Sequence, residues 1–331
     1  MKFIPAFYFP TTVHLVDDEY EFLKEMKWTL DPSVATYNIF PDPQVVLEHI
    51  GAQQGEGTYI NQWLKEGEMG SIVAQVYDLY KQIYSLQRFS QVSTVVVDYD
   101  MPLMNGLELC EKITSPHIQK ILLTGAADDN LAIHAFNKGL IHGFIRKHDP
   151  NVIQLLEEFI KKGQQQFFQS LTKTYMTAVT MDRENTFLLQ PEFVKLFERL
   201  VRENKVTEYY LKDHTGQFIF LNEKGEMGAL FVYQAEVVDI INHELITQAQ
   251  RFQGENAQFD RLLKDLKNRK KMVVENCFEE QMIFTDPEIL LANAHEVHGL
   301  EGVPGCYWFL MPFKNSTNAI VSWEKFRYQE E

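Results

Sequence analysis

The sequence predicts an α/β fold with a doubly wound, five-stranded parallel sheet, followed by an α+β domain with an antiparallel sheet. In the first half, short apolar β-type runs alternate with amphipathic helical segments, as is typical of parallel sheets. In the second half, short turns separate the β-type runs, as is typical of an antiparallel meander. Polar side chains stand directly after several first-half runs, where open α/β sheets carry their chemistry.

The elements of the first half follow one another in a regular order. The β-type runs lie near 12–17, 35–40, 94–98, 119–123 and 142–146. The helical segments lie near 19–30, after Pro43, near 106–113 and 128–138, and from about 150. The interval between the second and third runs is too long for one helix with short loops. Apolar residues recur there at helical spacing, so we expect a helical insertion at about 51–90. It either elongates the second helix or presents an interaction surface.

Acidic, hydroxyl and basic side chains follow four of these runs. They are the pair Asp17 and Asp18, then Asp98, Thr124 and Lys147. Clustered carboxylates repel one another and raise each other's pKa values unless a hard cation such as Mg²⁺ lies among them. A carboxylate beside Mg²⁺, with a hydroxyl and an ammonium opposite, can accept a phosphoryl group, because the cations neutralise the charge on its oxygens. The pattern therefore predicts a Mg²⁺ site and an aspartyl phosphate.

Over roughly residues 10–165 the chain resembles the receiver domains of bacterial two-component response regulators, which have a flavodoxin-like sheet. The resemblance implies that Asp98 is the phosphoacceptor and that Asp17 and Asp18 hold Mg²⁺ with it. The backbone carbonyl of Asp100 would complete the metal site. Gly106 fits the family's loop after the acceptor.

Three further residues match the family's switch. The resemblance implies that Thr124 is the switch hydroxyl, Lys147 the family's lysine, and Phe144 the aromatic residue whose rotamer follows Thr124. The chain departs from the family at two places. The family usually has proline directly after the lysine, whereas Pro150 comes three residues later here. The acid Asp100 lies near the path of the attacking water, so the rate of dephosphorylation is not predicted.

The segment Asp98-Tyr99-Asp100 also resembles the nucleophile and acid/base pair of haloacid-dehalogenase-type phosphatases. In that family the acidic pair comes late in the chain, after the lysine. Here Asp17 and Asp18 come first, so the order of the motifs favours the receiver.

Length and composition set the class of the protein. The chain has 331 residues, of which 45% are hydrophobic, enough for two domains with a core each. A net charge of −15 argues against a broad nucleic-acid footprint. The three cysteines, Cys110, Cys277 and Cys306, are too widely spaced for a disulfide framework, and we expect them to be buried in a reducing compartment. The apolar N-terminal decapeptide is too short for a signal or membrane span, so a cytoplasmic location is expected.

The domains are expected at 1–150 for the receiver, 151–185 for a long linker helix and 186–331 for the output domain. The apolar stripe of the linker helix allows two interpretations: a parallel dimer seam, or packing on its own C-terminal domain. The output domain should contain a helix at 191–204, an antiparallel meander, helices near 235–252 and 256–270, and further β-type runs that end with 319–323.

The function of the output domain is not readable from its motifs. The hairpin at 211–222 weakly resembles the opening of PAS sensory domains. His295 and His298, with Cys306 or Glu301, form a weak candidate metal site. No nucleotide loop, nucleophile elbow or other enzyme signature is visible. We therefore expect no enzyme activity beyond the receiver's own phosphorylation and dephosphorylation.

The sequence thus predicts a response regulator that takes a phosphoryl group from a histidine kinase or phosphotransfer protein onto Asp98, with Mg²⁺ as cofactor. Phosphorylation would change homodimerisation or contacts with the output domain. The output domain would bind a protein partner, and no membrane partner is expected. One alternative is a receiver-regulated enzyme or small-molecule sensor. Another, which is not favoured, is an atypical DNA-binding regulator. Its basic residues would be Arg251, Arg261, Lys264, Lys267, Arg269, Lys270 and Lys271.

Overall fold

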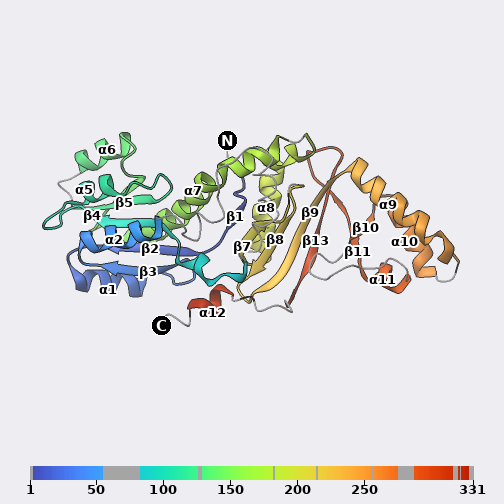
Figure 1. Cartoon of the computed structure of the whole chain (residues 1–331), viewed down its shortest axis with the longest axis horizontal. Coiled ribbons are helices and arrows are strands. Elements are labelled where there is room, and N and C mark those ends of the chain that lie inside the picture. Colours follow the sequence, from blue (N-terminus) through green and yellow to red (C-terminus); the bar gives the residue numbers. More distant parts are fainter. Residues whose placement is uncertain are drawn as a thin grey trace.

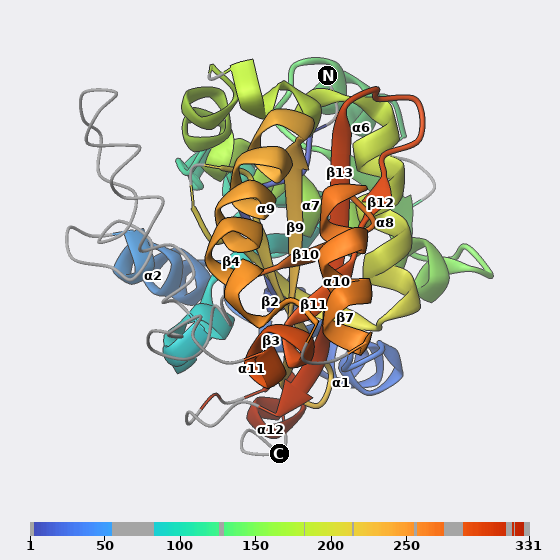
Figure 2. The same cartoon turned by 90° about the vertical axis from the view of Figure 1, so that its right-hand side faces the viewer.

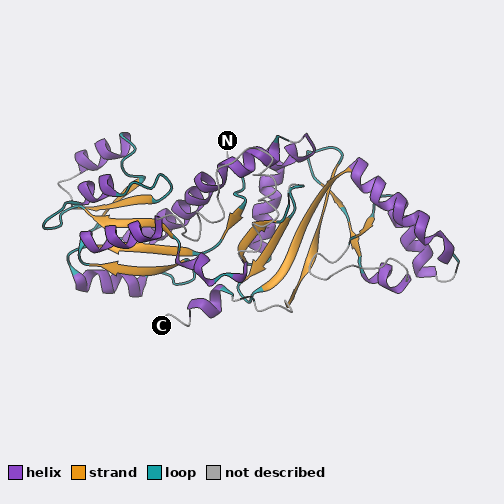
Figure 3. Ribbon diagram, viewed as in Figure 1, coloured by secondary structure: helices purple, strands orange, loops and turns teal. Residues whose placement is uncertain are grey.

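The computed structural model describes residues 3–54, 83–125, 129–181, 183–213, 215–254, 257–274, 287–315, 320 and 322–327. Two large sheets follow one another along the long axis of the molecule, and the long helix α7 (Val152–Thr180) runs from one to the other (Figure 1). A lobe made mostly of helices continues the molecule beyond the second sheet (Figures 1 and 3).

The first sheet is parallel and has five strands in the order β3-β2-β4-β5-β6. Its strands are β2 (Thr11–Val16), β3 (Ala35–Phe40), β4 (Val92–Asp98), β5 (Gln119–Thr124) and β6 (Gly143–Arg146). Its helices are α1 (Tyr20–Thr29), α2 (Pro43–Gln54), α5 (Gly106–Lys112) and α6 (Asp129–Asn137), with a short 3₁₀ helix at Leu86–Ser90. Residues of α1 and α7 pack on one face, and residues of α2, α5 and α6 pack on the other. The predicted doubly wound parallel sheet is therefore confirmed.

The central strands are apolar on both sides because helices cover both faces of the sheet. Every residue of β2, β4 and β5 is buried, which explains the unbroken run Val95-Val96-Val97. Most of the predicted insertion at 51–90 lies outside the described residues. The structure describes the insertion at its two ends alone, which are the last turn of α2 and the residues from 83 onward.

The apolar stripe of α7 is buried inside the chain. Leu156 and Ile160 pack on the parallel sheet, whereas Phe168 and Met176 belong to the core shared with the antiparallel sheet. Of the two interpretations offered by the sequence, the structure shows the intramolecular one. No helix of the described residues, α7 included, is long and apolar enough to cross a membrane.

The second sheet is antiparallel, with six strands in the order β1-β7-β8-β9-β13-β12. Its strands are β1 (Phe7–Tyr8), β7 (Val206–Leu211), β8 (Phe218–Asn222), β9 (Glu226–Gln234), β12 (His298–Gly299) and β13 (Cys306–Asn315). A 3₁₀ segment (Arg183–Leu189) and helix α8 (Pro191–Glu203) precede it, and Phe197 of α8 packs on Phe218 with ring centroids 4.9 Å apart. The predicted antiparallel sheet is confirmed, while the PAS-like resemblance of its first hairpin stays a prediction.

Strand β1 was not predicted. Phe7 pairs with Tyr210 and Tyr8 with Tyr209, so the N-terminal segment forms the edge of the second sheet before the chain enters the first. The sequence signal for β1 is weak because the strand has only two residues and its partner strand is distant in sequence. The domain boundaries at 150 and 185 stay predictions, and β1 lies outside the parallel sheet.

The distal lobe has its own small core. It contains α9 (Ala235–Ala249), a 3₁₀ turn (Gln250–Phe252), α10 (Ala257–Lys267), β10 (Lys271–Val273), α11 (Pro287–Ala292) and β11 (Ala294–Glu296). Strands β10 and β11 form an antiparallel pair, and α9 and α10 lie beside it (Figure 2). The buried side chains of Phe259, Leu262 and Leu266 anchor α10 to this core.

The prediction of a strand at 319–323 is wrong for its described residues, since Ile320 and Ser322 lie outside any strand and Trp323–Arg327 form helix α12. Helical spacing puts Trp323 and Phe326 on one face, and both rings pack on Phe89, at centroid distances of 5.0 and 4.8 Å. A strand would turn these two side chains to opposite faces. The Trp323 Nε1 also donates to the carbonyl of Ser33 at 3.1 Å, so α12 contacts the receiver.

The two sheets are joined by a continuous core that contains a buried ion pair. Arg88 Nε donates to Glu208 Oε2 at 2.8 Å, with side-chain exposures of 0% and 1%. The carboxylate also accepts from the Tyr210 hydroxyl at 2.7 Å, and Arg88 Nη1 donates to the carbonyl of Ser85 at 2.7 Å. The pair links the segment before β4 to β7 of the second sheet.

Gln164 of α7 forms a second polar link at this junction. Its Nε2 donates to Thr11 Oγ1 and to the carbonyl of Val34, both at 3.0 Å. Its Oε1 accepts from the Tyr8 hydroxyl at 3.1 Å. Strands β1 and β2 therefore share one buried side chain of α7, and neither sheet can shift along the helix without breaking these bonds.

Candidate functional site

The register of the parallel sheet brings the predicted residues to one edge. Val16 pairs with Val97, so Asp17 leaves β2 beside Asp98 at the end of β4. Thr124 ends β5 and pairs with Arg146, directly before Lys147. The carboxyl ends of four strands therefore meet at a single site, as the sequence predicted from the positions of these side chains.

Three carboxylates at this edge form a compact group of oxygen donors. Asp17, Asp18 and Asp98 each offer an oxygen, and these oxygens all lie within 4.8 Å of one another. Asp17 and Asp98 are buried, whereas Asp18 is exposed. Closely spaced carboxylate oxygens suit a hard cation such as Mg²⁺, so the residues present fit the predicted metal.

Lys147 stands between two of these carboxylates. Its Nζ lies 2.7 Å from Asp17 Oδ2 and 2.9 Å from Asp98 Oδ1. Burial lowers the pKa of Lys147, but hydrogen bonds and charges from the two aspartates outweigh burial and raise it. Burial raises the pKa of Asp98, against the opposing effect of Lys147. The lysine therefore stays protonated, and its charge is directed at the Asp98 carboxylate.

Thr124 and Phe144 lie beside this group on β5 and β6. The Thr124 hydroxyl is buried and has no hydrogen-bond partner among the residues that the structure describes. A buried hydroxyl without a partner is costly unless it has another use. Phe144 pairs with Leu122 in the sheet and packs, half-buried, on the main core. Their roles as switch residues stay predictions.

The loop after Asp98 returns the chain very close to the strand end. The Gly106 N–H donates to the Tyr99 carbonyl at 2.9 Å, and a Cβ at position 106 would stand 2.2 Å from the Asp98 carbonyl oxygen. Only glycine fits there. Asn105 and Glu108 close a capping box on α5, which the sequence analysis missed although the Asn-x-x-Glu spacing is a known signal. Asp100 is exposed in this loop, and metal binding by its carbonyl stays a prediction.

The weak metal candidate in the C-terminal half is not supported. Among the described residues, the aspartate group is the one cluster of three His, Cys, Asp or Glu side chains that could hold a metal. The ring of His295 instead stacks on Phe309, and that of His298 tilts against Trp308. Cys306 and Cys110 are free thiols, and both are buried, as predicted. Cys277 lies outside the described residues.

A comparison with protein families assigns this part of the chain to a family. Residues 57–159 match the response regulator receiver domain family. The chain contains a response regulator receiver domain. The match begins after Asp17 and Asp18, and the pairing of β2 with β4 brings these two acids beside Asp98.

A full-length relative is known from solved structures. The response regulator LqsR of Legionella pneumophila is 29% identical, with a TM-score of 0.75, over 99% of this chain and 96% of that one. The similarity therefore includes the C-terminal half, and it supports a two-component response regulator for the whole chain.

Other solved structures match about half of the chain. A response regulator receiver domain protein from Clostridium thermocellum is 19% identical, with a TM-score of 0.33, over 46% of this chain and 94% of that one. A protein described as an adenylate cyclase from Rhodopirellula baltica is 20% identical, with a TM-score of 0.36, over 51% and 97%. No curated protein matches the chain.

Proposed function

We propose that this protein is a phosphorylation-dependent switch that accepts a phosphoryl group on Asp98. The observation that carries the proposal is the arrangement at the sheet edge. Asp98 shares the Lys147 ammonium with Asp17, and a third carboxylate lies within 4.8 Å. A carboxylate nucleophile, the Lys147 ammonium and a group of carboxylates of the kind that binds Mg²⁺ thus lie together at one edge of the sheet.

The phosphoryl donor would be a phosphohistidine of a kinase or phosphotransfer protein. A carboxylate oxygen of Asp98 attacks the phosphorus, and the nitrogen–phosphorus bond breaks. The imidazole nitrogen leaves with the bonding electron pair, and an acyl phosphate forms. Lys147 then donates to a phosphoryl oxygen, and the Thr124 hydroxyl, which has no partner among the described residues, can donate to another.

Asp17, Asp18 and Asp98 would hold Mg²⁺, with the Asp100 carbonyl as a further ligand. When bound, the metal would neutralise charge on the transferring phosphoryl group. The Lys147 ammonium, which lies 2.9 Å from Asp98 Oδ1, would supply part of this neutralisation from the protein itself.

We further propose that the signal reaches the C-terminal half through α7 and the junction core. A shift at Thr124 and Phe144 moves β5 and β6, whose faces carry α7. The same helix packs on the second sheet through Phe168 and Met176. The readout is then a change in the packing of α7 on the output domain or in homodimerisation, with a protein partner bound through the output domain. The α7 stripe is already buried, so a dimer must use another surface.

Phosphotransfer is tested by labelling with acetyl phosphate in the presence of Mg²⁺. Wild type should form one phosphate per chain that alkali and hydroxylamine release, as expected of an acyl phosphate, and Asp98→Asn should form none while keeping its circular dichroism and melting temperature. Labelling of Asp98→Asn would overturn the assignment. Chelation of Mg²⁺ should also stop labelling, because the clustered carboxylates then lack their cation.

The readout is tested by light scattering with and without Mg²⁺ and beryllofluoride, a mimic of the aspartyl phosphate. A mass increase in wild type but not in Asp98→Asn supports a phosphorylation-driven dimer. An unchanged mass, with labelling intact, supports a signal carried within one protomer across the junction.

A further inference from the structure

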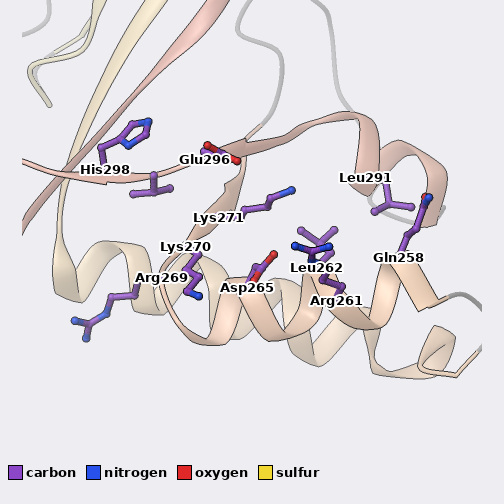
Figure 4. A pocket seen from close by; sticks show the side chains of 11 residues that line it. Gln258, Arg261, Leu262, Asp265, Arg269, Lys270, Lys271, Leu291, Glu296 and His298 are labelled. Atoms are coloured by element: carbon purple, nitrogen blue, oxygen red, sulfur yellow. The ribbon is translucent and has the colours of Figure 1, made fainter.

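A cavity in the distal lobe lies at the end of the molecule opposite the phosphoacceptor edge. It is open to solvent, has a volume of about 730 Å³, and is lined by residues of α10, α11 and the β10–β11 pair. In Figure 4, Lys271 extends from β10 over α10, where Arg261 and Asp265 point toward it, with Leu291 of α11 beyond them, whereas Arg269 and Lys270 point away. Its size is that of a small-molecule site.

The cavity is locally basic in an acidic protein. Four basic side chains line it, Arg261, Arg269, Lys270 and Lys271, against two acidic ones, Asp265 and Glu296. The whole chain carries a net charge of −15. A cationic concave site on an acidic surface attracts small anions, whereas the rest of the surface repels extended polyanions.

Only one of these four cations is neutralised within the described part of the chain. Arg269 Nε donates to Asp239 Oδ1 at 2.6 Å, and a second guanidinium nitrogen binds the other oxygen. Arg261, Lys270 and Lys271 form no ion pair with a described residue. Lys271 stands directly opposite Glu296 in the β10–β11 register, yet their charged groups do not come within ion-pair distance. Arg261 and Lys271, which line the cavity without an ion-pair partner among the described residues, can therefore bind an anionic group.

The turn that carries these lysines is held rigidly. Arg269 adopts a left-handed backbone conformation, with φ of 53°, at the end of α10. The buried Asn242 donates to the carbonyls of Leu266 at 2.9 Å and Lys271 at 3.1 Å, and the Val297 N–H donates to the Lys270 carbonyl at 3.0 Å. The backbone at Lys270 and Lys271 is therefore fixed before any ligand arrives, which lowers the part of the entropy cost of binding that comes from ordering this turn.

We propose that this cavity binds a nucleotide. Arg261 and Lys271 would bind its phosphate groups, and the carboxylates of Asp265 and Glu296 would accept from its ribose hydroxyls or amino groups. The partly exposed Leu291 offers an apolar contact for the base. The two acids disfavour a phosphate backbone running through the site, so we favour a small nucleotide over nucleic acid.

The proposal is tested with the full chain by isothermal titration calorimetry. The probes are the mono-, di- and triphosphates of adenosine and guanosine, with the two unphosphorylated nucleosides as ligand controls. At least one nucleotide should bind, and its nucleoside should bind much more weakly. Arg261→Gln and Lys271→Gln should each weaken binding by about tenfold or more, because each removes a charge-assisted hydrogen bond.

Lys264→Gln and Lys267→Gln are the matched controls. Both residues lie exposed on α10 but do not line the cavity, and their replacement should change affinity less than about twofold. Absence of binding by every nucleotide at millimolar concentration would overturn the proposal. So would equal losses in all four variants, or binding of an oligonucleotide in preference to nucleotides, since either indicates a basic surface for nucleic acid. Asp98→Asn should bind nucleotide normally, which separates this test from that of phosphotransfer.

Discussion

Two ion pairs at opposite ends of the parallel sheet differ in how completely the protein encloses them. At the functional edge, Lys147 is 15% exposed and faces two carboxylates that no other described cation neutralises. At the junction, Arg88 and Glu208 are 0% and 1% exposed, and Tyr210 and Ser85 bind their remaining polar atoms. The first pair can exchange partners with an incoming ligand, whereas the second cannot without opening the core.

The comparison distinguishes an ion pair that can bind a ligand from one that holds the two sheets together. A half-open cluster with excess negative charge is stabilised further by a metal and can accommodate a phosphoryl group. A closed pair with all its hydrogen bonds made stabilises one relative position of the two sheets, because removal of either partner leaves a buried charge.

The largest expected effect on stability comes from opening the closed pair. Arg88→Ala should lower the free energy of unfolding by about 3–5 kcal/mol, because Glu208 remains buried without its cation. Urea denaturation monitored by circular dichroism measures this loss.

Two controls make that test specific. Lys24→Ala removes the exposed pair with Glu21 and should cause no measurable loss. The double variant Arg88→Met with Glu208→Leu should lose less than Arg88→Ala alone, since no uncompensated charge remains. A single variant as stable as wild type would show that the junction pair does not hold the sheets together.

A smaller effect on stability, but a large one on reactivity, is expected at the open pair. Lys147→Gln removes the ammonium from Asp17 and Asp98, which solvent and metal can partly replace. Its free energy of unfolding should fall less than that of Arg88→Ala, while labelling by acetyl phosphate should slow by about a hundredfold. If stability fell as far as in Arg88→Ala and labelling stayed normal, the roles assigned to the two pairs would be reversed.

The smallest effect is a pH dependence at Asp98. Burial raises the pKa of this carboxyl above its ordinary value of 3.8, so between the two values the folded state binds more protons than the unfolded state. Asp98 therefore destabilises the fold as pH rises through this window. The melting temperature of wild type relative to Asp98→Asn, without metal, should fall as the pH rises above 3.8, and Mg²⁺ should reduce the difference. A rise with pH would contradict the assigned direction.

The site was predictable because its residues follow from local rules. Parallel strands end at a common edge, so an acid after one run and a lysine after another meet whatever the loops between them do. Asp17, Asp98 and Lys147 meet in this way. The capping box of α5 and the tight fit at Gly106 also involve residues that are close in sequence. Only the capping box has a spacing that can be recognised in the sequence.

The sequence alone determined the parallel sheet, the polar edge and the long helix, because period, order and spacing are properties of short segments. Only the tertiary structure decided how the two halves join. The strand β1, the packing of Trp323 and Phe326 on Phe89, and the pairing of Arg88 with Glu208 connect segments more than a hundred residues apart. Such contacts leave no periodic signal in the sequence, since each depends on which surfaces the folded elements bring together.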